Sequence, residues 1–338
     1  MTLKKDQALN TIDSVDIDRL CEGVLAKLPS DQHALVQKVL NDLLLGNEAG
    51  QLNALEPHFH NQPAKQTAFH HALHTALILA EFQADGVSRA AALLMALPLA
   101  KLNQTDQLSR DYGKEVSQLV QGALSLVRLT QLTRQAQSHE KADVASQKEM
   151  LRKMLLAMAA DLRIVLIRLG SRLQTLRWHA AHKIPCDLGL AKETLELYAP
   201  LASRLGIWQI KWEIEDLAFR FTEPEIYKQI AKQLEEKRVE RETFIRETVA
   251  QLQASLKEMG IDAEVSGRPK HIFSIWNKMR NKHLDFNALY DLRAVRVIVP
   301  EDRHCYEVLA LVHQLWSPVS DEFDDYIAAP KENYYQSL

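Results

Sequence analysis

The chain has 338 residues, of which 41 are basic and 44 acidic, so its formal net charge is −3. A hydrophobic share of 46% in a chain of this length supports two folded domains, and the balanced charge excludes a general attraction to nucleic acid or to anionic membranes. No apolar run approaches the roughly 20 residues that a membrane span needs, and the first residues lack the apolar core of a secretion signal. Three cysteines without metal-ligand spacing suit a reducing compartment. The sequence therefore predicts a cytoplasmic protein with no membrane contact.

A helical pattern extends from about residue 16 to residue 258, because Leu, Ala and Ile recur at three- and four-residue spacing. Two stretches, 91–100 and 154–170, lack a clean polar face and are expected as buried helices of a bundle. Residues 225–258 alternate acids and bases around a narrow apolar stripe, which predicts a long charged helix that ends at Gly260. The first part of the chain is therefore expected to be all-helical.

The periodicity changes after Gly260. The runs at 261–265 and 292–299 are rich in β-branched residues and have the length of strands, and a helical pattern at 274–284 separates them. A further helix is expected over 303–316. Two strands are too few for an independent sheet, so the second domain is expected to be α/β and incomplete.

The segment GRPKHIFSIWNKM at 267–279 carries the most informative chemical pattern. Lys270, Ser274 and Lys278 follow one another at four-residue steps, so a helix places them on one face, and Arg268 lies just before them. Two ammonium groups, a hydroxyl and a guanidinium suit a polyphosphate, whose charge must be neutralised and held in position. A solvated basic helix face is the alternative interpretation.

Asp291 precedes the second predicted strand, and Arg293 and Arg296 follow it. A carboxylate at the edge of a sheet can bind Mg²⁺ in phosphoryl or nucleotidyl transfer, where the metal bridges the substrate phosphates. An Asp at this place can equally be a turn residue that begins the strand.

The last segment, DEFDDYIAAPKENYYQSL at 321–338, combines acidic, basic and aromatic side chains. An aromatic face can stack on a purine base. An acidic solvated loop followed by a partly buried strand is the alternative. The residues concerned are Glu322, Asp324, Asp325, Lys331, Tyr334 and Tyr335.

Taken in this order, GRPKHIFSI, DLRAVRV and EFDDYIAAPKENYYQSL resemble the synthetase domain of the RelA/SpoT homologues, and the resemblance continues upstream through 193–221. It is strong from about residue 190 onward and faint before. It implies an α plus α/β fold, in which an all-helical, degenerate HD-hydrolase-like domain (1–195) and connecting helices (196–259) precede part of a nucleotidyltransferase-like mixed-sheet synthetase domain (260–338).

The family uses Mg²⁺ and transfers the β,γ-pyrophosphate of ATP to the 3′-hydroxyl of GDP or GTP, which forms the alarmone (p)ppGpp. The resemblance implies that Arg268 and Asp291 are catalytic and that Asp291 is the Mg²⁺ ligand. The implied ATP-binding residues are Arg268, Lys270, Ser274 and Lys278, and the implied GDP- or GTP-binding residues are Lys331, Tyr335 and Gln336.

An acidic loop at Glu322-Phe323-Asp324-Asp325 resembles that of family members that only synthesise, which implies the RelA branch. Tyr334 stands where such relatives often carry a small or aliphatic residue. The family's general base, a Glu on a later strand, would fall beyond Leu338. Because a missing general base typically costs about 10²- to 10⁴-fold in rate, we expect an amino-terminal portion of a longer enzyme, with little or no activity of its own.

Family members that hydrolyse (p)ppGpp hold Mn²⁺ with a His, a His-Asp pair and a distant Asp. Here His71 occupies the first position, whereas Met95, Ala96 and Ser171 occupy the others. Thioether, methyl and hydroxyl groups are not the hard donors that Mn²⁺ prefers. We therefore expect no Mn²⁺ in this domain, no hydrolase activity, and a regulatory role towards the synthetase.

Other interpretations remain open. A metal site formed by the local histidines His58, His60, His70, His71 and His74 is a disfavoured alternative. A catalytically silent nucleotide-binding fragment, a two-activity synthetase-hydrolase and a purely structural helical scaffold compete with the synthetase. The expected partners are ATP and GTP or GDP and, in a full-length relative, the ribosome and uncharged tRNA.

Overall fold

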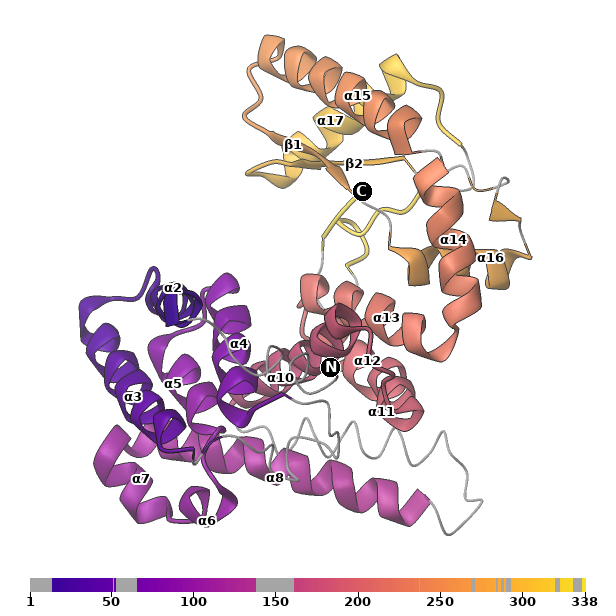
Figure 1. The fold of residues 1–338 in the computed structure, drawn as a ribbon. Helices are drawn as coiled ribbons and strands as arrows, with labels where there is room; N and C mark the ends of the chain where they lie inside the picture. Colours follow the sequence, from indigo (N-terminus) through magenta and orange to yellow (C-terminus); the bar gives the residue numbers. More distant parts are fainter. Residues whose placement is uncertain are drawn as a thin grey trace. The chain divides into compact units, whose positions relative to one another are not determined.

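The structure, a computed structural model, describes residues 14–50, 52, 66–137, 161–236, 238–268, 271–283, 285, 286, 289, 293–319, 323–330 and 336–338. Contacts divide the chain into two units, Met1–Leu201 and Ala202–Leu338. Figure 1 shows helices throughout the first unit and a small sheet in the second, which confirms the predicted class. Every helix in the described ranges is too short or too polar to span a bilayer.

The first unit is a bundle whose central helices are buried along most of their length. α4 (Ala68–Glu81) packs against α5 (Gly86–Leu94) and α10 (Leu162–His182), and almost every residue of α5 is buried. The surrounding elements are α2 (Ser14–Leu25), α3 (Ser30–Glu48), α6 (Leu99–Leu102), α7 (Thr105–Tyr112), α8 (Lys114–Gln137), α11 (Leu188–Glu193) and a π-helical turn over Thr194–Tyr198. α12 (Ala199–Arg204) follows and crosses the boundary between the units.

The two stretches that were expected as buried helices have different outcomes. Residues 162–170 lie in α10 and are largely buried, as predicted, whereas 154–160 lie outside the described residues. Residues 91–96 are buried, as predicted, and the stretch is divided at Pro98, because α5 ends at Leu94 and α6 begins at Leu99. Proline has no N–H to continue the helical ladder and is tolerated only near a helix start, so this residue separates the two helices.

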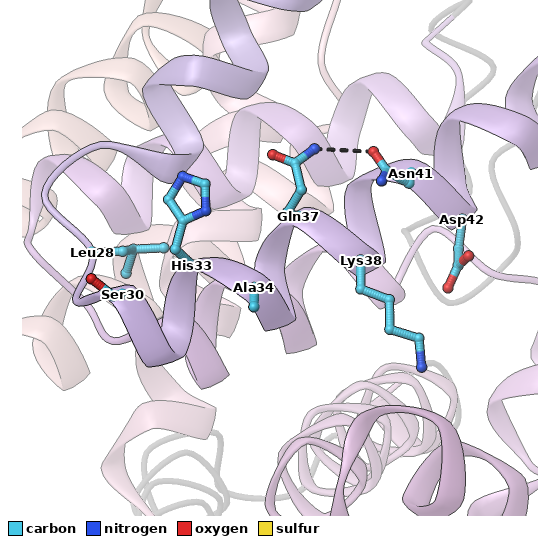
Figure 2. Close-up of a pocket in the computed structure, with 8 residues that line it drawn as sticks. All are labelled: Leu28, Ser30, His33, Ala34, Gln37, Lys38, Asn41 and Asp42. Atoms are coloured by element: carbon cyan, nitrogen blue, oxygen red, sulfur yellow. Dashed lines mark hydrogen bonds between the residues drawn. The ribbon is translucent and has the colours of Figure 1, made fainter.

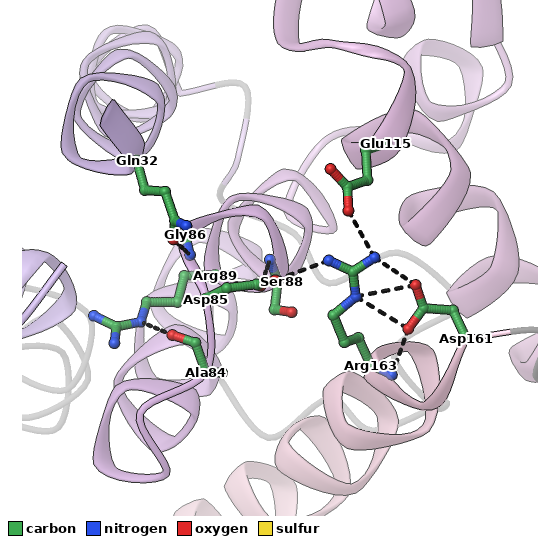
Figure 3. A network of polar contacts seen from close by, with 9 residues as sticks. All are labelled: Gln32, Ala84, Asp85, Gly86, Ser88, Arg89, Glu115, Asp161 and Arg163. Carbon is green, nitrogen blue, oxygen red and sulfur yellow. Dashed lines mark hydrogen bonds and ion pairs between the residues drawn. The ribbon is translucent and has the colours of Figure 1, made fainter. Parts of the chain in front are cut away.

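Carboxylates hold together the amino-terminal ends of three helices in this unit (Figure 3). Asp85 caps α5 by accepting the Ser88 N–H at 2.8 Å, and Asp161 caps α10 by accepting the Arg163 N–H at 2.9 Å. The Arg163 guanidinium pairs with both caps and with Glu115 of α8, at 2.8 Å from Asp85 and 2.8 Å from Glu115. The Arg163 side chain therefore links the amino-terminal ends of α5, α8 and α10 and helps to hold these three helices together.

The second unit combines helices with a two-stranded antiparallel sheet in its described part. β1 (Glu264–Arg268) pairs with β2 (Ala294–Ile298), and α16 (Ile272–Lys282) lies between them in sequence. One apolar cluster joins α15 (Arg238–Glu258), the sheet and α17 (Asp302–Leu315), and a second joins α14 (Pro224–Glu236) to α16. α13 (Trp208–Thr222) also packs against α14 and α16.

Five sequence predictions for this unit can be compared with the structure. The strand over 292–299 and the helices over 274–284 and 303–316 are confirmed within two residues, because β2, α16 and α17 occupy them. The first strand is three residues late: Ile261 N–H still donates to the Leu256 carbonyl at 3.0 Å, which completes the turn after Gly260 at φ 70°. The single charged helix over 225–258 is described as two, α14 and α15, on either side of residue 237.

Candidate functional site

His71 of α4 and Ser171 of α10 stand at two of the family's four metal-ligand positions, and their side chains are in contact. Ser171 Oγ lies 3.0 Å from His71 Nε2, and Gln66 Oε1 lies 3.2 Å from His71 Nδ1. Both contacts are satisfied when Nδ1–H donates to the Gln66 carbonyl oxygen and Nε2 accepts from the Ser171 hydroxyl. The imidazole that stands at the first ligand position of the resembled family is thus buried and hydrogen-bonded to a neutral hydroxyl.

Met95 and Ser171 line a cavity of about 10 Å³ beside this pair, together with Thr75, Ala92, Ile167 and Arg168. That volume is at the lower limit for one water molecule. Ala96 is buried next in sequence, and within the described residues no group of three or more His, Cys, Asp or Glu converges on a point. The structure brings the four predicted positions into one region, but their donor set does not fit a hard divalent ion such as Mn²⁺.

The other histidines of α4 form a ring stack with α10. The His70 ring lies 5.5 Å from that of His74 and 5.8 Å from that of Trp178, and Trp178 stacks on His182 at 3.6 Å. His74 Nδ1 is 2.9 Å from the His70 carbonyl oxygen, and His182 Nδ1 is 3.0 Å from that of Trp178. His58 and His60 lie outside the described residues. The described rings are thus engaged in stacking and in bonds to carbonyl groups, which is a packing role.

This stack predicts an acid-sensitive fold. Burial, with smaller contributions from His74 and His182, lowers the pKa of His70 from 6.5 to about 4. The unfolded chain therefore binds the proton more readily between these values, so the free energy of unfolding is expected to fall as pH drops from 6.5 towards 4. The loss for this group is on the order of 2 kcal/mol. Urea unfolding followed by circular dichroism over this pH range measures it.

The variant His70→Gln removes the titrating group and is expected to flatten this pH dependence. Because His33 is exposed, His33→Gln is the matched control and should leave the pH dependence as it is in the natural chain. Equal slopes for the natural chain and His70→Gln would contradict the assignment.

A buried ion pair that the sequence pattern does not indicate begins at Arg172, the residue after Ser171. The side chain of Arg172 has 0% exposure, and its Nη2 lies 3.1 Å from Glu193 Oε2. Nη1 donates to the Leu190 carbonyl at 3.1 Å and to Thr194 Oγ1 at 3.3 Å. The guanidinium also lies 4.2 Å above the centre of the Tyr198 ring. One signal was available: the α10 sequence has no clean polar face, so a charge in its middle had to be buried and paired.

Arg168 brings a second guanidinium to the same place, where its Nη2 donates to the Tyr198 hydroxyl at 3.4 Å. Burial raises the pKa of Tyr198, but the charges of Arg172 and Arg168 outweigh burial and lower that pKa below its ordinary value. This region of α10 is therefore electropositive inside, which further disfavours a divalent cation in the adjacent cavity.

In the second unit, the register of the hairpin brings two predicted segments to one end of the sheet. The backbone of Arg268, the last residue of β1, is opposite Ala294, the first residue of β2. A Cβ added to Gly267 would lie 2.5 Å from Ile245 Cγ2 of α15, so this close packing requires glycine. The carboxyl end of β1, in the GRPKH segment, and the amino end of β2, in the DLRAVRV segment, therefore lie side by side.

α16 places Ser274 and Lys278 one turn apart, both partly accessible, while Ile275 faces the apolar core with 0% exposure. Their four-residue spacing thus falls on one helix, as predicted. Several other predicted residues lie outside the described part of the chain, as does the side chain of Arg268. They are Lys270, Asp291, Glu322, Lys331, Tyr334 and Tyr335.

Part of the acidic loop is a turn in its own right. Asp325 accepts the Ile327 N–H at 2.9 Å and the Ala328 N–H at 2.8 Å, and the Tyr306 hydroxyl donates to it at 3.1 Å. These bonds, the Ala328 N–H foremost, lower the pKa of Asp325. Phe323, Asp324 and Gln336 are exposed. Asp325 therefore shapes the loop, a role that the sequence pattern does not indicate.

A groove of about 660 Å³ runs along α3, and its lining includes none of the predicted site residues. Figure 2 shows the side chains that line it. Several of its polar side chains bond to each other or to neighbours: Gln37 Nε2 donates to Asn41 Oδ1 at 3.0 Å, and the Tyr112 hydroxyl donates to Asp42 at 3.0 Å. The lining residues are Leu28, Ser30, His33, Ala34, Gln37, Lys38, Asn41 and Asp42. With its polar groups so engaged, the groove does not define a reaction centre.

Comparison with known proteins gives two family matches and a set of relatives. The family described as an HD domain matches residues 52–208, and the family described as a region found in RelA / SpoT proteins matches residues 267–338. Proteins named GTP pyrophosphokinase from Photobacterium angustum and Escherichia coli are each 44% identical to the chain, over 261 and 263 residues. The one from Haemophilus influenzae is 43% identical over 263 residues. Each alignment covers 77% of this chain and 35% of the relative, so the chain spans about a third of their length.

Proposed function

The chain belongs to the RelA/SpoT family, and we propose that the full-length protein is a (p)ppGpp synthetase that transfers pyrophosphate from ATP to the 3′-hydroxyl of GTP or GDP. The observation that carries this proposal is the match over 267–338, since that range contains every residue predicted to bind nucleotide. The GTP pyrophosphokinase relatives support the same reaction.

In this proposal separate segments of the synthetase region bind the two nucleotides and the metal. Arg268, Lys270, Ser274 and Lys278 hold the ATP phosphates, and Lys331, Tyr335 and Gln336 bind the guanine nucleotide. A carboxylate oxygen is the donor that Mg²⁺ prefers, which fits Asp291 as its ligand. When bound, Mg²⁺ supplies charge neutralisation on the phosphates. The protein's own task would be to bring the acceptor hydroxyl in line with the ATP β-phosphorus, so that the new O–P bond forms as the bond to the α-phosphate oxygen breaks and AMP leaves, while the family's Glu takes the hydroxyl proton.

For the helical unit we propose a non-functional hydrolase that binds no Mn²⁺. The buried hydroxyl at Ser171 and the apolar side chains Met95 and Ala96 support this, because they supply one weak donor in place of three strong ones. The unit then regulates the synthetase. Family membership and the acidic Glu322–Asp325 loop support a RelA-branch enzyme that works in the cytoplasm with the ribosome and uncharged tRNA.

The test is pyrophosphate transfer from labelled ATP to GTP and GDP by the full-length protein. Asp291→Asn is expected to lower kcat on the order of 10²- to 10³-fold, because a bound metal contributes several kcal/mol of charge stabilisation. Lys278→Ala is expected to raise KM for ATP roughly tenfold through a lost charge-assisted contact.

Asp262→Asn and Lys257→Ala are the matched controls, since both side chains are exposed and carry no proposed role. Both should retain natural activity. ATP binding without any transfer would instead favour the alternative, a catalytically silent nucleotide-binding regulator. Mn²⁺-dependent (p)ppGpp hydrolysis would sink the proposal for the helical unit.

A further inference from the structure

α16, the helix that carries Ser274 and Lys278, has no cap of its own. The residue before its first turn is His271, whose side chain makes no capping bond. The cap comes from Asp216 of α13: its Oδ1 accepts the Phe273 N–H at 2.8 Å, and its Oδ2 accepts the Ile272 N–H at 3.2 Å. His271 Nδ1 lies 3.4 Å from the same Oδ2. A carboxylate 56 residues earlier in the chain therefore supplies the missing acceptor at this helix start.

Aromatic contacts make this connection rigid. Trp212, one turn before Asp216, stacks on His271 with ring centres 5.1 Å apart. Phe219, with 0% exposure, packs against Phe273 at 5.5 Å and Trp276 at 4.7 Å. The capping carboxylate is thus flanked by ring contacts between the same two helices, so the start of α16 is fixed relative to α13.

The consequence for the site follows from helix geometry. Phe273 is adjacent to Ser274, and Lys278 follows one turn later, so a shift of the first turn displaces both side chains. We propose that Asp216 is a positioning residue for ATP, which holds the first turn of α16 so that Ser274 and Lys278 contact the phosphates together. This inference rests on the proposed function and deepens it, since the proposed function assigns Asp216 no role.

The experiment compares the full-length natural protein with Asp216→Ala and Asp216→Asn. Titration with a non-hydrolysable ATP analogue and Mg²⁺ is expected to give a Kd roughly five- to tenfold higher for Asp216→Ala, the effect that a lost helix cap is worth. In the transfer assay KM for ATP should rise by the same factor, with KM for GTP unchanged. Asp216→Asn should lie between the two, because its amide oxygen can still accept the Phe273 N–H.

A merely structural role predicts another pattern, a smaller active fraction with lower kcat and unchanged KM for both nucleotides. Asp187→Ala is the matched control: Asp187 caps α11 through the Leu190 N–H at 2.8 Å and has no place in the nucleotide site. It should lose a comparable cap and keep its ATP affinity.

The outcomes separate the two proposals. An unchanged ATP-analogue Kd in Asp216→Ala, with the natural protein binding normally, overturns the positioning role. Analogue binding that Asp216→Ala weakens, in a protein that transfers no pyrophosphate, supports the positioning role and overturns the synthetase function. Absence of analogue binding by the natural protein overturns both.

Discussion

The triple variant Met95→His, Ala96→Asp, Ser171→Asp is expected to bind Mn²⁺ on the order of 10²-fold or more tightly than the natural chain, because the number of charged ligands sets divalent affinity over several decades. His71 already has the second contact that a metal-binding imidazole needs, from Nδ1 to Gln66 Oε1 at 3.2 Å, which directs Nε2 to position 171. Met95 and Ser171 line the same cavity. Isothermal titration and electron paramagnetic resonance of bound Mn²⁺ measure the gain.

The same variant should be less stable than the natural chain without metal and regain stability with it. New buried carboxylates are costly when unpaired, and an ion that binds only the folded state stabilises it by mass action. The single variant Ser171→Asp is the control, since one carboxylate and one imidazole make a poor site. If the folded triple variant shows no Mn²⁺-dependent increase in melting temperature, the four positions do not share a metal geometry, and the inferred loss of a metal site is wrong.

The helical half could be predicted from the sequence because its apolar residues recur at helical spacing. Burial along α4 and α10 extends over nearly all of their faces, which the absence of a clean polar face indicated for the first part of α10. Boundaries depended on single residues. Pro98 divides the apolar stretch 91–100, and the turn after Gly260 moves the start of β1 from residue 261 to residue 264. The pattern of apolar residues does not contain this information, since Leu99 and Ile261 fit either side of the boundary.

In the candidate site, too, residues spaced along one helix could be predicted, whereas contacts between residues far apart in the sequence could not. Motifs identify Ser274 and Lys278 because their spacing along one helix is itself the geometry. The Asp216 cap could not be predicted, since its two acceptor contacts join residues 56 and 57 positions apart. One indication was available: no Ser, Thr, Asp or Asn stands at position 271, so the start of α16 needed an acceptor from elsewhere.

Arg172→Met is expected to lower the free energy of unfolding by about 3–5 kcal/mol, the typical effect of breaking a buried ion pair. The substitution leaves the Glu193 carboxylate, with a side chain only 13% exposed, without its guanidinium partner. It also removes a donor from the Leu190 carbonyl and from Thr194 Oγ1, and an aromatic contact with Tyr198. Urea unfolding of the chain, followed by far-ultraviolet circular dichroism, measures the change.

The double variant Arg172→Met, Glu193→Leu separates the ion pair from the packing. Replacing both partners with apolar side chains leaves no unpaired charge, and buried pairs replaced in this way are often no less stable. We therefore expect the double variant to recover much of the stability that Arg172→Met loses, so that the two substitutions are strongly non-additive. Additive losses would mean that Arg172 stabilises α10 mainly through its contacts with the Leu190 carbonyl, Thr194 and Tyr198, and that the charge of Glu193 contributes little.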